Sequence, residues 1–156
     1  QQELAQAQKM WAKYSEGTQI MSSDHKYMDI DGKMVALEDL RGKYVYIDVW
    51  ATWCGPCKAE LPYLKKLEKK FEGKNIYFVS ISIDANKAAW IKMVQEDHLG
   101  GIQLHGGNKA QIAKDYAIRA IPRFILLDRE GKVINKEMTR PSDSETEETL
   151  NALEGI

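Results

Sequence analysis

Cys54 and Cys57 are the two cysteines of the chain, and together they form a Cys-x-x-Cys motif. An apolar segment, residues 44–50, precedes the motif, and a helical pattern follows it. The unpaired amides at the start of such a helix favour a thiolate on the first cysteine and lower its pKa. Cys54 is therefore predicted to be the nucleophile, and Cys57, one turn further on, is placed to resolve the mixed disulfide. Pro56 suits the first turn because its missing N–H donor costs nothing there.

The sequence does not indicate metal binding or nucleic-acid binding. Two thiols supply only half of a four-thiolate zinc site. The three histidines, His25, His98 and His105, lack the spacing of metal ligands, so we interpret them as ordinary surface or loop residues and expect no metal site. The net charge is −1 and basic residues adjoin one another at most in pairs, which argues against nucleic-acid binding.

Length and composition favour one domain over residues 1–156. The chain has 156 residues, 44% of them hydrophobic, which is enough for one continuous core. No apolar run approaches the roughly 20 residues of a membrane-spanning helix, and no signal-peptide pattern opens the chain. Because the first residue is Gln1 and not Met, we expect either a mature product or a domain cut from a longer protein.

The first half of the chain predicts an alternation of strands and helices. Helical spacing indicates a peripheral amphipathic helix over residues 3–16, and Asp31-Gly32 indicates a tight hairpin within residues 27–37. Residues 44–50 and 76–83 are predicted to be inner strands because they are apolar on both faces. A helix over residues 56–72 joins them, so parallel pairing through a right-handed crossover is expected.

The second half predicts the remaining layers of an α/β sandwich. Helices are expected at residues 86–97, 109–116 and 142–153, the last with a capping box formed by Ser142 and Glu145. Residues 102–105 fit either a strand or a loop, and residues 124–134 fit a hairpin that ends the sheet. The expected fold is a three-layer sandwich, a central mixed sheet with about two helices on each side.

A family resemblance rests on several motifs. The run from Asp48 to Lys58, with Ala120-Ile121-Pro122, resembles the thioredoxin superfamily. The motifs that are more similar to the TlpA/ResA-type extracytoplasmic thiol-disulfide oxidoreductases are Asp31-Gly32-Lys33, Gly42-Lys43, Glu60-Leu61-Pro62 and the extra segment 86–107. The match covers about residues 27–153. It implies a thioredoxin-like core there, an N-terminal extension over residues 1–26 and a central insertion.

The resemblance also implies a substrate-binding surface around the nucleophile. It assigns Trp53, Gly55, Pro56, Ile121 and Pro122 to that surface, with Pro122 in the cis form beside the first cysteine and the Ile121 backbone pairing to a bound substrate strand. Independently of the family, a proline directly before an apolar strand fits either a cis bond or a strand entry. The alternative is a trans proline that merely opens the strand.

Two acids compete for the proton-transfer role. Asp48 stands in an otherwise apolar strand, so burial should raise its pKa and make it a base or acid for Cys57. Glu60 follows Cys57 by one helical turn and could reach the same cavity, the alternative being a solvated carboxylate on the helix surface. By resemblance, Asp48 matches the buried aspartate of thioredoxins and Glu60 a glutamate of the ResA-type branch. Ser80 stands where thioredoxins carry a lysine.

The leading functional prediction is a thiol-disulfide oxidoreductase that reduces protein disulfides, with no cofactor beyond its own redox-active disulfide. The resemblance implies a periplasmic or other extracytoplasmic location and a membrane thiol-transfer partner as reductant. It is also compatible with a membrane tether in the full-length protein. The Gly-Pro pair between the cysteines favours a reducing couple.

Two other functions stay open. The chain could be a non-catalytic binding or redox-sensing domain of a larger exported protein, although an intact redox motif argues against that. A peroxiredoxin-like peroxidase needs Thr or Ser three residues before its reactive cysteine, and Ala51 occupies that position.

Overall fold

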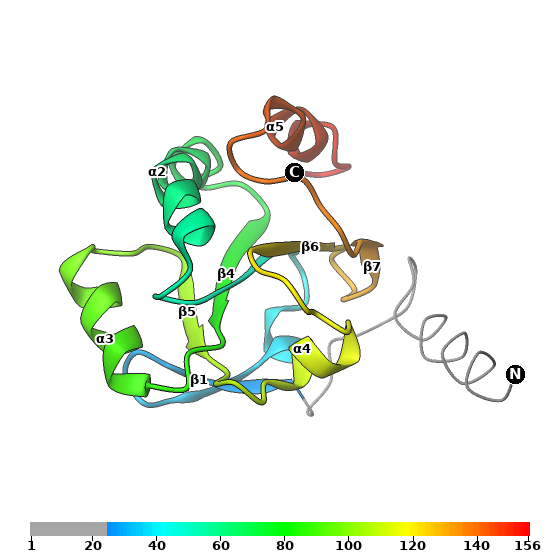
Figure 1. The fold of residues 1–156 in the computed structure, drawn as a ribbon. Coiled ribbons are helices and arrows are strands. Elements are labelled where there is room, and N and C mark those ends of the chain that lie inside the picture. The colour runs from blue at the N-terminus through cyan, green and yellow to red at the C-terminus, as the bar shows by residue number, and fades with distance from the viewer. Residues whose placement is uncertain (1–24) are drawn as a thin grey trace, which may run out of the picture.

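The computed structural model describes residues 25–156, so the helix predicted over residues 3–16 lies outside the described residues. Figure 1 shows helices packed around a twisted sheet. The elements in chain order are β1 (Lys26–Asp29), β2 (Met34–Ala36), the 3₁₀ turn η1 (Leu37–Leu40), β3 (Tyr44–Trp50), α2 (Gly55–Lys70), β4 (Ile76–Ser82), α3 (Lys87–Glu96), β5 (Ile102–His105), α4 (Gln111–Asp115), β6 (Arg123–Leu127), β7 (Val133–Asn135) and α5 (Ser144–Asn151).

The strands of the described range form one mixed sheet in the order β2-β1-β5-β4-β3-β6-β7. β3 pairs in parallel with β4 from Tyr44 opposite Ile76 to Trp50 opposite Ser82, which confirms the pairing predicted for two strands joined by a helix. β6 pairs antiparallel with β3, and β7 ends the sheet. The segment Ile102–His105, which fitted either a strand or a loop, is strand β5 between β4 and β1.

Helices cover both faces of this sheet, as predicted for a three-layer sandwich (Figure 1). α2 and α5 lie on one face over an aromatic cluster that includes Tyr46. α3 packs on the same side, because its Trp90 and Val94 join a cluster with Trp50 and the two cysteines. η1 and α4 cover the opposite face over another cluster, which includes Ile112. Three helices therefore share one face, where about two were predicted, since the apolar side of α3 is turned toward the redox motif.

Strand β3 is buried along its whole length, which fits its position between β4 and β6. Side chains alternate along a strand, so Tyr46, Asp48 and Trp50 point to the face that α2 covers, and the residues between them point to the opposite cluster. Asp48 lies opposite Ser80 of β4 and Phe124 of β6. A carboxyl group is thereby enclosed by uncharged neighbours within the sheet.

Helix α5 begins two residues later than predicted. Its first residue is Ser144 and its N-cap is Asp143, whose Oδ1 accepts the N–H of Glu145 at 2.9 Å. The expected N-cap, Ser142, lies one residue before this cap. Its hydroxyl donates instead to the carboxylate of Glu60 in α2 at 2.8 Å, so it is not available to cap the helix.

His25 lies in a loop before β1, as expected. It is buried, however, so the expectation that it is a surface residue is wrong. Its Nε2 lies 3.0 Å from Asp115 Oδ2, and its Nδ1 lies 3.2 Å from the hydroxyl of Tyr27. That hydroxyl accepts the N–H of Ile112 at 3.0 Å. These contacts fasten the start of the hairpin to α4.

Candidate active site

The redox motif occupies the N-terminus of α2, as predicted. Cys54 is the N-cap residue, and it forms a disulfide with Cys57 across a Cα–Cα distance of 5.3 Å. The backbone N–H of Cys57 donates to Sγ of Cys54 at 3.2 Å. Both side chains are buried. The first turn of the helix thus directs an amide at the first sulfur, where it would stabilise a thiolate after reduction.

The loop before β6 closes the site from the opposite side. The Ile121–Pro122 peptide bond is cis. The carbonyl oxygen of Ile121 lies 3.7 Å from Sγ of Cys54, although the two residues are 67 positions apart in the sequence. Strand β6 starts at Arg123, directly after Pro122, and pairs with β3. The sheet therefore holds this loop beside the redox motif.

The residues assigned to substrate binding form a rim around the buried disulfide. Trp53 is exposed, with 67% of its surface accessible. Gly55 and Pro56 are also exposed, and Ile121 and Pro122 are half-buried. An exposed tryptophan beside a buried sulfur pair is an apolar surface on which a partner chain can pack.

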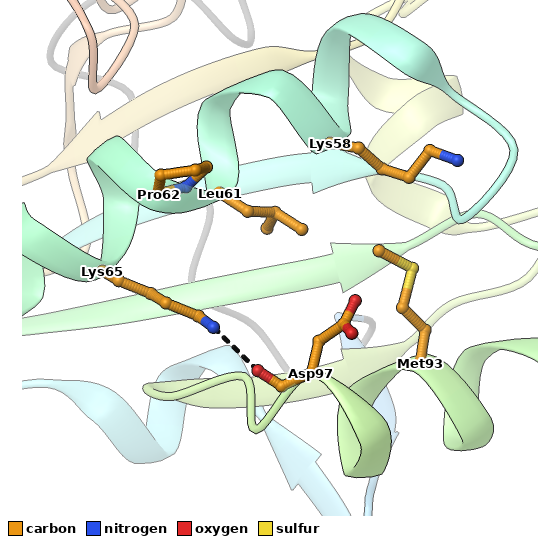
Figure 2. A pocket seen from close by; sticks show the side chains of 6 residues that line it. All are labelled: Lys58, Leu61, Pro62, Lys65, Met93 and Asp97. Carbon is orange, nitrogen blue, oxygen red and sulfur yellow. Dashed lines mark hydrogen bonds between the residues drawn. The ribbon is translucent and has the colours of Figure 1, made fainter.

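A groove of about 440 Å³ runs between α2 and α3 (Figure 2). Its walls are Lys58, Leu61, Pro62 and Lys65 of α2 with Met93 and Asp97 at the facing end of α3. Figure 2 shows Lys65 reaching across to α3, where its Nζ donates to the carbonyl oxygen of Asp97 at 2.7 Å. Because Lys58 directly follows Cys57, one end of the groove lies next to the redox pair.

Asp48 is buried on the α2 side of the sheet, 6% exposed. Its Oδ1 has no hydrogen-bond partner among the described residues. Burial above all, and then the charges of Glu60 and Glu68, raise the pKa of Asp48 to about 8. An acid of this pKa can both take up and release a proton near neutral pH.

Glu60 is also buried, 8% exposed, so the alternative of a solvated surface carboxylate is wrong. Its Oε1 accepts the backbone N–H of Ser142 at 2.9 Å, and its Oε2 accepts the hydroxyl of the same residue at 2.8 Å. The two candidate acids therefore differ in their surroundings. Glu60 is hydrogen-bonded through both oxygens, whereas Asp48 is enclosed with one oxygen unpaired among the described residues.

A hydrogen-bond network that the sequence did not reveal supports the loop before Cys54. The carboxylate of Asp84, just beyond β4, accepts the N–H of Thr52 at 3.1 Å and its hydroxyl at 2.6 Å. Ser82 donates to the same carboxylate, and Nε2 of His105 donates to the carbonyl oxygen of Asp84 at 2.8 Å. The redox loop is thus tied to both β4 and β5.

Asp84→Asn is expected to lower the free energy of unfolding by about 1–3 kcal/mol. The carboxylate of Asp84 accepts hydrogen bonds from Thr52 and Ser82 through both of its oxygens, whereas the side-chain amide of Asn has only one oxygen that can accept. Urea denaturation of the oxidised protein measures the change. Asp97→Asn, at an exposed aspartate, is the matched control and should stay within about 0.5 kcal/mol of the wild type. An equal effect of the two substitutions would contradict the role given to Asp84.

Two features are absent from residues 25–156. No group of three or more His, Cys, Asp or Glu side chains in that range is arranged to hold a metal ion. Within the same range, no helix is both long enough and apolar enough to cross a membrane.

The fold and the site define a class of protein. A mixed sheet carries a Cys-x-x-Cys disulfide at a helix N-terminus, opposite a cis-proline loop, and this is the arrangement of a thioredoxin-like domain. The model of the family described as Redoxin matches residues 15–153.

Comparison with known protein sequences narrows the class of protein further. The thiol-disulfide oxidoreductase ResA of Bacillus cereus is 33% identical over 109 residues, which cover 69% of this chain and 62% of the relative, so the match spans less than two thirds of that protein. ResA of Bacillus thuringiensis subsp. konkukian is 30% identical over 126 residues, 80% of this chain and 72% of the relative. The chain belongs to the redoxin family and, within it, to the ResA-type thiol-disulfide oxidoreductases, as the sequence motifs predicted.

Solved structures agree with this assignment. A solution structure of a proposed thiol-disulfide oxidoreductase from Bacteroides vulgatus has 59% identity and a TM-score of 0.77, covering 83% of this chain and 87% of that one. The thioredoxin domain of a thiol-disulfide oxidoreductase from the same organism has 30% identity and a TM-score of 0.74, covering 88% and 94%. The thioredoxin-like fold is thereby confirmed, and the relatives support dithiol redox chemistry at the cysteine pair.

Proposed function

We propose that this protein reduces disulfide bonds in protein substrates through Cys54 and Cys57. One observation carries the proposal. Sγ of Cys54 receives the N–H of Cys57 at 3.2 Å and lies 3.7 Å from the carbonyl oxygen of Ile121, so the first sulfur stands between an activating helix end and a cis-proline loop. The family membership supports the same chemistry.

The reaction starts from the reduced pair and runs in two exchanges. In the first, the thiolate of Cys54 attacks one sulfur of the substrate disulfide. A Cys54–substrate disulfide forms, and the other substrate sulfur leaves with the electron pair and takes up a proton. In the second, Cys57 loses its proton and attacks Sγ of Cys54. The Cys54–Cys57 disulfide forms, and the substrate leaves with its second sulfur reduced.

Asp48 is the group proposed to take the proton of Cys57. It shares a strand face with Trp50, which packs in one cluster with Cys57. Its pKa, raised to about 8, suits a base that must release the proton again when the pair is re-reduced. The chemistry needs no cofactor, because the two electrons of each cycle are held by the cysteine pair.

The rim formed by Trp53, Gly55, Pro56, Ile121 and Pro122 is the proposed docking surface for the substrate chain. Trp53 supplies the exposed apolar contact. The backbone of Ile121, next to Sγ of Cys54, is proposed to pair with an extended substrate strand, which would place the substrate sulfur in line with the nucleophile.

The proposed location is the periplasm or another extracytoplasmic space, where protein disulfides are available as substrates. The proposed electron source is a membrane thiol-transfer protein that reduces the Cys54–Cys57 disulfide after each cycle. The resemblance to TlpA/ResA-type proteins supports both points.

The reduction potential is expected to lie closer to that of thioredoxin, about −270 mV, than to that of the oxidant DsbA, about −120 mV. The Gly-Pro pair between the cysteines is the reason for this expectation. Equilibration with glutathione buffers of known ratio measures the potential. A value close to that of DsbA would reverse the proposed direction of electron flow.

Trapping with Cys57→Ser tests the function. The variant keeps the nucleophile and lacks the resolving thiol, so it should accumulate a covalent adduct when it is mixed with a disulfide-containing protein such as insulin. Mass spectrometry after non-reducing digestion should place the bond on Cys54. Dithiothreitol should release the adduct.

The double variant Cys54→Ser/Cys57→Ser is the control and should form no adduct. If Cys57→Ser also stays free of substrate while a known dithiol reductase variant traps it under the same conditions, the proposed function is wrong. A binding or redox-sensing domain would give that result.

A further inference from the structure

Ser142, in the turn before α5, is hydrogen-bonded to the redox helix. Ser142 donates its backbone N–H to Oε1 of Glu60 and its hydroxyl to Oε2, at 2.9 Å and 2.8 Å. The two residues are 82 positions apart in the sequence. A backbone N–H can only donate, so the carboxyl oxygen that it meets must accept. Two donors on two oxygens suit the carboxylate form, which is an acceptor at both atoms.

Asp48 has no comparable anchor. Its Oδ1 is buried without a hydrogen-bond partner among the described residues, and the strands on either side present Ser80 and Phe124 to it. The negative charge of Glu60 follows burial as the second cause that raises the pKa of Asp48. The two buried carboxyl groups thus divide into one that is anchored by hydrogen bonds at both oxygens and one that has an unpaired oxygen among the described residues.

We propose that Ser142 is a positioning residue that makes this division: its two hydrogen bonds fix the carboxylate of Glu60 in place, and Asp48, acted on by that charge, is left as the acid that exchanges a proton with Cys57. The role in the redox step depends on the function proposed above. The division between the two acids is a property of the resting, oxidised protein and exists without substrate.

The proton transfer then has one direction in each half of the cycle. When Cys57 attacks Sγ of Cys54, its proton passes to the Asp48 carboxylate, the new S–S bond forms, and the bond to the substrate breaks with the electron pair on the substrate sulfur. The fixed negative charge of Glu60 favours the protonated form of Asp48, which makes Asp48 a stronger base. When the pair is reduced again, Asp48 returns the proton to Cys57.

Among the described residues, the titratable groups with a stated electrostatic effect on or from Asp48 are Tyr46 of β3 and Glu60 and Glu68 of α2. Cys57 lies in the cluster with Trp50 on the same face. The pKa of Tyr46 is raised, first by burial, so it stays neutral in the range considered. Burial raises the pKa of Glu68 to about 7 against the opposite effect of Lys65. β4 and β6 contribute the uncharged Ser80 and Phe124.

The test is the titration of Asp48 in the oxidised protein, followed by ¹³C NMR of labelled aspartate carboxyl groups. In Ser142→Ala the hydroxyl donor is lost, the carboxylate of Glu60 is held by one hydrogen bond instead of two so that its charge is no longer fixed in place, and the titration midpoint of Asp48 is expected to fall by about half a pH unit. Glu60→Gln removes the charge itself and should lower the midpoint further, by about one unit. An unchanged or higher midpoint in Ser142→Ala would overturn the proposal.

Three further variants separate positioning from a general structural effect. Ser142→Thr retains the hydroxyl and should keep the wild-type midpoint. Ser144→Ala, two residues away at the exposed start of α5, is the matched control and should do the same. In the Glu60→Gln background, Ser142→Ala should have no additional effect, since the group through which it acts is already neutral.

The pH profile of the second exchange adds a kinetic readout. Release of substrate from the Cys54 adduct should follow the ionisation of Asp48, so its midpoint should move to lower pH in Ser142→Ala by the same amount as in the NMR titration. If the NMR midpoint moves while the release profile does not, Ser142 positions Glu60 but Asp48 is not the base for Cys57, and the proposal fails in its second part. Failure of the trapping experiment would remove the proposed function and leave the NMR result intact.

Discussion

Cys54→Ser is expected to lose disulfide reduction down to the uncatalysed background, a loss of about 10³-fold or more. A serine hydroxyl stays protonated at neutral pH and is a far weaker nucleophile toward sulfur than the thiolate that the amide of Cys57 would stabilise. The dithiothreitol-coupled reduction of insulin, followed by the turbidity of the released chain, measures the rate.

Two other variants serve as comparisons for Cys54→Ser. Without dithiothreitol, Cys57→Ser should cleave one equivalent of substrate disulfide and stop as the covalent adduct, so it keeps the first exchange, which Cys54→Ser loses. Met34→Ala, at an exposed position of β2, should keep the wild-type rate. A Cys54→Ser protein as active as the wild type would exclude the proposed order of attack.

Asp48→Asn is expected to stabilise the folded protein at pH 8 by a few kcal/mol. Folding moves the pKa of Asp48 from its ordinary value of 3.8 to about 8. Between these two pH values the folded protein binds more protons than the unfolded chain, so the wild type loses unfolding free energy as the pH rises. The whole interval corresponds to an upper limit of about 6 kcal/mol at 1.36 kcal/mol per pH unit, and Asn, which does not titrate, avoids this cost.

Urea denaturation of the oxidised proteins at pH 4, 6 and 8 measures the effect. The difference between Asp48→Asn and wild type should grow steadily across this series. Glu68, whose pKa is raised to about 7, adds its own slope in both proteins, and because its charge also raises the pKa of Asp48, only the part of that slope that is independent of Asp48 cancels in the difference. Asp31→Asn, in the exposed turn of the hairpin, should show no such trend. A difference independent of pH would mean that the Asp48 carboxyl is no costlier to ionise in the folded protein.

The same substitution should slow the second exchange, because it removes the proposed proton acceptor for Cys57. Stability and turnover would thus change in opposite directions at one residue, as is common where a buried charge serves a reaction.

Much of the fold follows from local sequence patterns. The apolar run Tyr44–Trp50 predicted the buried strand at its observed bounds, and the Asp31-Gly32 pair predicted the hairpin between β1 and β2. The redox motif in its strand-to-helix setting predicted the N-terminus of α2 and the position of Cys54 at that end. These features depend on residues close in sequence, where periodicity and turn chemistry decide the structure.

Other features depend on contacts between distant segments, which a single sequence does not display. Ser142 carried the pattern of a helix cap, and nothing nearby showed that its hydroxyl would be taken by Glu60. Asp84 could have been suspected, because it follows the apolar strand β4 and so lies at the same sheet edge as the cysteines. Its partner Thr52 was not predicted.

The hydrogen bond between His105 and Asp84 connects segment 86–107, which the sequence predicted to be an insertion, to the loop before Cys54. Segment 86–107 begins just after Asp84 and rejoins the sheet through β5. There the ring of His105 donates a hydrogen bond to the carbonyl oxygen of Asp84. The carboxylate of that residue holds Thr52, two positions before the nucleophile. Segment 86–107 therefore helps to hold the loop that carries Cys54, so a change in its packing would reach the proposed nucleophile through two hydrogen bonds.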